Sequence, residues 1–111
     1  MQLETALRNL ASSPDLDPFR QLIGTLRAYD SKRCDSHLVR TLRVFFSSNA
    51  NASETADKLL LHRNSVLYRL ARIQELTGLN LQDPRARLAL QLGLLAIEDR
   101  ERSYDGEAEY P

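Results

Sequence analysis

Residues 52–76 of the chain read ASETADKLLLHRNSVLYRLARIQEL, and this stretch decides the fold. Its apolar residues recur every three or four positions, first over a short segment and then over a longer one, which is the spacing of amphipathic helices. Asn51 stands just before the stretch and Glu54 follows three residues later, an arrangement typical of a capped helix start. We therefore predict a short helix over about residues 52–60, a tight turn, and a second helix over about residues 63–77.

Positive charge gathers on the second of these helices. It carries Arg63, Arg69 and Arg72, and no acidic residue lies between Lys58 and Gln74. A short helix packed against a second helix whose polar face is cationic is an arrangement that enters the major groove of DNA. The alternative interpretation is a pair of ordinary bundle helices whose arginines form only a solvated face.

The rest of the chain favours more helices and no sheet. Asp-Pro pairs at residues 17–18 and 83–84 mark two helix starts, because Asp can cap a helix and Pro is tolerated at its first position. No run alternates polar and apolar residues. Apolar residues at helical spacing predict three further helices, over about residues 18–29, 36–46 and 84–101. We predict an all-α domain of about five helices that contains a helix-turn-helix motif.

The pattern divides the chain into three segments. Residues 1–16 are expected to form either an N-terminal helix packed on the domain or the stub of a linker. Residues 17–101 form the helix-turn-helix domain. Residues 102–111 are polar and acidic, and we predict that they form a disordered tail.

The last helix is apolar around more than one side. A domain of this size does not easily bury a helix on all sides. We therefore predict a homodimer in which Leu90, Leu94 and Ile97 of the last helix meet a second copy of the chain.

The overall charge neither requires nor excludes a nucleic acid. The chain has 15 Lys and Arg against 15 Asp and Glu. Residues 98–111 hold six of the acids and two of the arginines, which leaves an excess of four positive charges over residues 1–97. The one cysteine, Cys34, cannot form a disulfide within the chain and suits a reducing compartment. No apolar run approaches the roughly 20 residues of a membrane span, so no membrane partner is expected.

No group of residues indicates catalysis, a metal or a cofactor. The two histidines, His37 and His62, have no partner at the spacing of a nucleophile–base pair or of a set of metal ligands. The chain also has no glycine-rich phosphate loop and no Cys-x-x-Cys motif. We predict that it is not an enzyme.

Several segments carry a resemblance to a known family. Residues 56–73 (ADKLLLHRNSVLYRLARI), residues 75–79 (ELTGL), the Asp-Pro pair at residues 83–84 and residues 87–92 (RLALQL) occur in the order and at the spacings of the C-terminal helix-turn-helix domain of PucR/CdaR-type bacterial transcription regulators. The resemblance covers about residues 36–97. More distantly, the motif is similar to the DNA-binding unit of Fis.

The resemblance implies roles for individual residues. It places His62, Arg63, Asn64 and Ser65 at the edge of the DNA groove, and Tyr68, Arg69 and Arg72 along the DNA backbone. His62 is also placed to cap the helix or to pack against it. Arg63 is suited to reading a guanine, since Arg to O6 and N7 is the commonest specific pairing, and a plain phosphate contact is the alternative. Leu67 stands where the family commonly has Arg, which removes one expected phosphate contact.

The resulting hypothesis is sequence-specific binding of double-stranded DNA by a PucR/CdaR-like transcription regulator, located in the bacterial cytoplasm at the nucleoid. The recognition helix, about residues 63–77, would lie in the major groove. Such regulators usually carry an effector-sensing region upstream, for which this chain has no room, so we expect a C-terminal fragment or an unusually short member. The alternative is a helical homodimerisation or protein-interaction module without DNA binding of its own.

Overall fold

The computed structural model describes the backbone of residues 2–108 and the side chains of residues 2–98. Six α-helices and one short 3-10 helix occur in this range, and no strand is found within it. They are α1 (Leu3–Ala11), η1 (Pro14–Leu16), α2 (Asp17–Lys32), α3 (Leu38–Ser47), α4 (Ala52–Leu59), α5 (Arg63–Thr77) and α6 (Pro84–Ala108). The predicted all-α fold is confirmed, with six α-helices in the described residues instead of about five.

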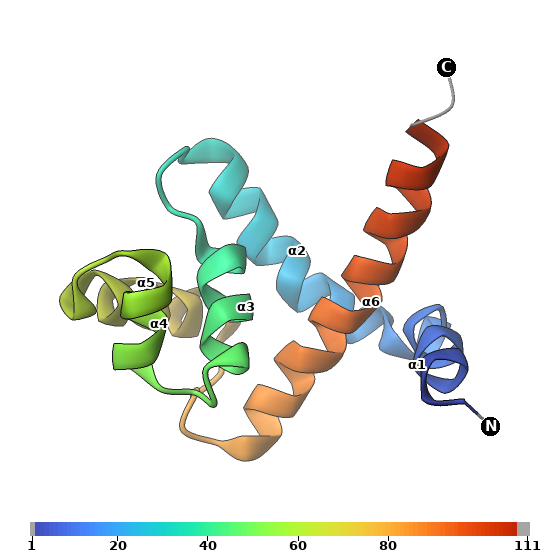
Figure 1. Cartoon of the computed structure of the whole chain (residues 1–111), viewed down its shortest axis with the longest axis horizontal. Coiled ribbons are helices and arrows are strands. Elements are labelled where there is room, and N and C mark those ends of the chain that lie inside the picture. Colours follow the sequence, from blue (N-terminus) through green and yellow to red (C-terminus); the bar gives the residue numbers. More distant parts are fainter. Residues whose placement is uncertain (1, 109–111) are drawn as a thin grey trace.

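The long helices α2 and α6 cross near the middle of the molecule (Figure 1). On one side of this crossing lie α3, α4 and α5, and on the other side lies α1. The two long helices approach closely at Gly93 of α6. A Cβ atom added there would overlap the carbonyl oxygen of Phe19 and lie 2.7 Å from Cγ1 of Ile23. Only glycine permits this crossing without a shift of the α2 backbone.

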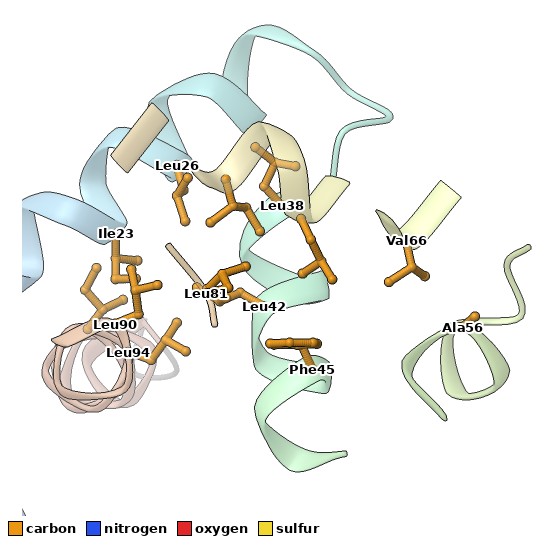
Figure 2. Close-up of a cluster of buried hydrophobic side chains, with 13 residues drawn as sticks. Ile23, Leu26, Leu38, Leu42, Phe45, Ala56, Val66, Leu81, Leu90 and Leu94 are labelled. Atoms are coloured by element: carbon orange, nitrogen blue, oxygen red, sulfur yellow. The ribbon is translucent and has the colours of Figure 1, made fainter. Parts of the chain in front are cut away.

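One hydrophobic core joins α2 through α6 (Figure 2). Ala56 is the buried residue that α4 contributes, and Ala52 of the same helix packs against the core. Val66, Leu70 and Ile73 form the buried side of α5. The other buried members of the core are Ile23, Leu26, Leu38, Leu42, Phe45, Leu81, Leu90, Leu94 and Ile97.

The residues predicted to form a dimer face lie inside this core. Leu90, Leu94 and Ile97 are 0%, 6% and 7% exposed, so they cannot meet a second copy of the chain. That prediction was wrong because it assumed that one chain could not cover α6 on more than one side. In the structure α2 packs along α6 and α1 also packs against it. Leu88 is the large apolar residue of α6 that stays exposed among the described side chains.

Helices extend into both terminal segments of the chain. The buried side chain of Arg20 donates hydrogen bonds to the carbonyl oxygen of Ala11 and to the carboxylate of Asp17, which attaches the end of α1 to α2. At the other end, α6 continues to Ala108, beyond the predicted helix end near residue 101. Residues 102–108, which were predicted to be part of a disordered tail, are therefore helical. They contain no proline, the residue that most strongly interrupts a helix. Residues 109–111 of that tail lie outside the described residues.

Within the described residues, no helix has both the length and the apolar character needed to cross a membrane.

Candidate nucleic-acid interface

Helices α4 and α5 form the predicted helix-turn-helix. Asn51 caps α4, since its Oδ1 atom accepts a hydrogen bond from the backbone N–H of Glu54 at 3.0 Å. The helix ends at Leu59, and the C-cap residue Leu60 has a left-handed backbone with φ of 57° although no glycine occupies the turn. The backbone N–H of Leu61 then donates to the carbonyl oxygen of Ala56 at 2.9 Å. These contacts close the turn tightly and fix the direction in which α5 begins.

His62 serves as the N-cap of α5. Its Nδ1 atom accepts a hydrogen bond from the backbone N–H of Asn64 at 3.0 Å. Capping is one of the three roles that the sequence left open for this residue. The cap satisfies one of the free N–H groups of the first turn and leaves Arg63, Asn64 and Ser65 exposed.

The exposed side of α5 continues from this turn along the helix. Leu67 and Tyr68 follow on the surface and are both exposed. At the other end of α5, Gly78 adopts a left-handed conformation with φ of 72°, the helix stop expected for a glycine at this position. The helix therefore presents a mixed polar and cationic surface over its first two turns, and its opposite side is buried.

Arg69 points toward the domain. Its Nη1 atom donates a hydrogen bond to Oγ1 of the buried Thr41 at 3.1 Å, and its Nη2 atom donates to the carbonyl oxygen of Asp35 at 3.4 Å. These contacts hold α5 against α3 and against the loop between α2 and α3. The resemblance places Arg69 along the DNA backbone, whereas the structure shows it linking parts of the domain.

Arg72 lies among aromatic and acidic side chains at the surface. Its Nη1 atom pairs with Oε2 of Glu75 at 2.8 Å, and its Nη2 atom donates to the hydroxyl oxygen of Tyr68 at 3.1 Å. Its guanidinium lies 5.7 Å from the ring centre of Tyr68 and 5.8 Å from that of Tyr29. The hydrogen bond with Tyr68 and the negative charge of Glu75 raise the pKa of Arg72. Like any arginine, the group is positively charged at physiological pH.

An open groove of about 510 Å³ runs between α5 and the α2–α3 loop, residues 33–37. Asn64, Ser65 and Tyr68 of the predicted site line one wall. The full lining consists of Tyr29, Arg33, Asp35, Ser36, Leu38, Asn64, Ser65, Tyr68, Arg69 and Arg72. Sequence reasoning missed the wall formed by Tyr29, Arg33 and Ser36, because more than 25 residues separate it from α5 and no local spacing links the two.

Comparison with known families gives a match over residues 38–96, more than half of the chain, to the PucR C-terminal helix-turn-helix domain. The chain belongs to this family. The match begins at the start of α3 and ends within α6, so the PucR-type segment includes α4 and α5 but excludes α1 and α2. The residues of α2 that line the groove therefore lie outside it.

Three similar proteins have names that describe regulators. The Purine catabolism regulatory protein of Bacillus subtilis (strain 168) is 43% identical over 60 residues, which are 54% of this chain and 11% of that protein. The Carbohydrate diacid regulator of Escherichia coli (strain K12) is 44% identical over 63 residues, or 57% of this chain and 16% of that protein. The Proline-responsive transcriptional activator PutR of Bacillus subtilis (strain 168) is 30% identical over 78 residues, or 70% of this chain and 19% of that protein.

The chain thus spans less than a fifth of the length of these three relatives. No solved structure gives a significant match.

Proposed function

We propose that this chain binds double-stranded DNA in a sequence-specific manner, with α5 in the major groove. The observation that carries the proposal is the first turn of α5, which is capped by His62 and exposes Arg63, Asn64 and Ser65 at the end of a rigid helix-turn-helix. Recognition helices of this motif contact base edges through their N-terminal residues. The membership of the PucR family supports the same function.

The geometry supports two kinds of DNA contact along α5, one to base edges and one to phosphates. Arg63, Asn64 and Ser65 would contact base edges, and Tyr68 and Arg72 would contact phosphates. Arg69 would act indirectly, because its guanidinium holds α5 against α3 and the α2–α3 loop. His62 would act by capping α5, and Leu67 would add apolar contact where the family commonly has a cation.

The test compares Arg63→Ala with Arg72→Ala on duplexes selected from a random-sequence library. Arg63→Ala should cost about 1–3 kcal/mol of binding free energy on the selected sequence and relax the preference at one base pair. Arg72→Ala should weaken binding to all sequences alike, because a phosphate contact carries no sequence information. Fluorescence anisotropy on the selected duplex and on a scrambled one measures both effects. If both variants changed the selected and scrambled affinities equally, this division of roles would be wrong.

A second candidate function is self-association, and the surface of α1 favours it. Leu3, Leu7 and Leu10 lie along one stripe of α1 and are exposed, Leu3 to 73%. Sedimentation of the parent chain and of Leu7→Lys measures whether this stripe pairs two copies. A monomeric parent chain at micromolar concentration would remove the homodimer from the proposal and leave DNA binding by a single motif.

We infer that an effector ligand is bound by a region upstream of these 111 residues. The greater length of the relatives supports this view. The activities that their names describe belong to those proteins.

A further inference from the structure

The ring of Tyr29 brings together two guanidinium groups from separate parts of the chain. Arg33, at the end of α2, lies with its guanidinium 5.1 Å from the ring centre. Arg72 of α5 lies 5.8 Å from the same centre. Both distances are within the range of cation–π attraction, which holds a cation near an aromatic face. Tyr29 therefore keeps two positive groups beside the groove, one on each wall.

The loop that carries Arg33 is fixed by hydrogen bonds. The carboxylate of Asp30 accepts from the backbone N–H groups of Leu38 at 2.8 Å and Val39 at 3.1 Å, so a residue of α2 caps the start of α3. The hydroxyl of Ser36 donates one hydrogen bond that is shared between the same carboxylate and the carbonyl oxygen of Arg33. A side chain on such a fixed loop loses less conformational entropy on binding than one on a mobile loop.

The charge on the groove walls is predominantly positive. Three arginines line the groove, Arg33, Arg69 and Arg72, whereas Asp35 is the one acid in the lining. Glu75, next to the groove, pairs with Arg72, so Asp35 and Glu75 together offset two of the three positive charges and one remains. Gathering like charges costs free energy, and a bound anion lowers that cost. The chemistry of this groove therefore fits a phosphate.

We propose that the α2–α3 loop is a second DNA-contacting element, in which Arg33, positioned by Tyr29, binds a backbone phosphate next to the major groove occupied by α5. This inference rests on the proposed function and extends it beyond the helix-turn-helix. DNA is the occupant favoured over a free anion, because the groove opens along Asn64, Ser65 and Tyr68, the exposed residues of the recognition helix itself. The protein surface that contacts DNA is then wider than the helix-turn-helix motif alone.

The first experiment measures the salt dependence of binding to a random-sequence duplex, starting at low salt. Each phosphate contact releases counterions, so log K falls as log salt rises. The loss of one such contact reduces the magnitude of this slope by about 0.9 for B-form DNA. Arg33→Gln should reduce the magnitude of the slope by about that amount and weaken binding to all duplexes alike. The matched control is Arg8→Gln on α1, which lies at the opposite end of the molecule from α5 (Figure 1). The control should leave the slope unchanged.

A second pair of variants tests the positioning role of Tyr29. Tyr29→Phe keeps the aromatic ring and should keep the parent slope. Tyr29→Leu removes the ring while preserving an apolar side chain, and should lower the slope as Arg33→Gln does. Circular dichroism of both variants verifies that the helices are intact. Equal slopes for Phe and Leu at this position would overturn the role assigned to the ring.

The outcomes separate this inference from the proposed function. A parent chain that binds DNA and loses specificity in Arg63→Ala, but has an unchanged slope in Arg33→Gln, would overturn only the second contact. A parent chain that binds no duplex at low salt would overturn both. Tight binding of inorganic phosphate that is lost in Arg33→Gln, with DNA binding unaffected, would assign the groove to a free anion and would also overturn the proposal.

Discussion

At the scale of single residues, the turn between α4 and α5 contains an unusual leucine. Leu60 has φ of 57° and is 92% exposed, so its side chain makes almost no contact that could offset the cost of the left-handed backbone. For a residue with a Cβ atom this conformation costs roughly 1–2 kcal/mol relative to the right-handed one. Glycine adopts it without that penalty, which is why many such turns contain glycine.

We therefore predict that Leu60→Gly stabilises the chain by up to about 1 kcal/mol, since relief of the backbone strain exceeds the extra entropy that glycine gains in the unfolded chain. Leu60→Val is the matched variant and should destabilise, because a β-branched residue tolerates positive φ poorly. Urea denaturation measures both through the transition midpoint at constant slope. A lower midpoint for the glycine variant would show that Leu60 contributes a contact that outweighs the strain.

At the scale of helices, the crossing of α2 and α6 determines where the α2–α3 loop lies. The last turns of α2 provide Tyr29 and Asp30, so a shift of α2 would move both the groove and the cap of α3. Two glycines on these helices face different surroundings. Gly93 is buried against Phe19, whereas Gly24 of α2 is exposed and has no atom within 4 Å of an added Cβ.

Replacement of the two glycines by alanine should change the stability of the chain in opposite directions. Gly93→Ala should destabilise by about 1–3 kcal/mol, because the methyl group meets the backbone of α2 and forces the helices apart. Gly24→Ala should stabilise by up to about 1 kcal/mol, the difference in helix propensity between the two residues. Thermal unfolding of both variants provides the comparison. A shift of the two melting temperatures in the same direction would contradict the close approach at Gly93.

At the scale of the whole molecule, the features that the sequence predicted are those that interactions between neighbouring residues in the chain determine. The Asn51 cap and the bounds of α4 and α5 each depend on residues within a few positions of one another. The contacts that it missed join distant segments. Asp30 of α2 accepts a hydrogen bond from the start of α3, and Arg69 reaches Thr41 across 28 positions. No spacing pattern encodes such pairs, so half of the groove was also missed.

The same limit explains why the sequence assigned α6 the wrong exposed side, and Leu94 tests the correction. Leu94 is 6% exposed in the core, whereas Leu88 on the same helix is 55% exposed. Leu94→Asp should cost at least about 3 kcal/mol, since it removes a buried apolar side chain and places an unpaired carboxylate there. Leu88→Asp should change stability by no more than about 0.5 kcal/mol, as expected for an exposed position. Urea denaturation measures the stabilities, and sedimentation measures the mass. A Leu94→Asp chain that stayed folded and became monomeric from a dimeric parent would restore the original interpretation of α6 as the dimer face.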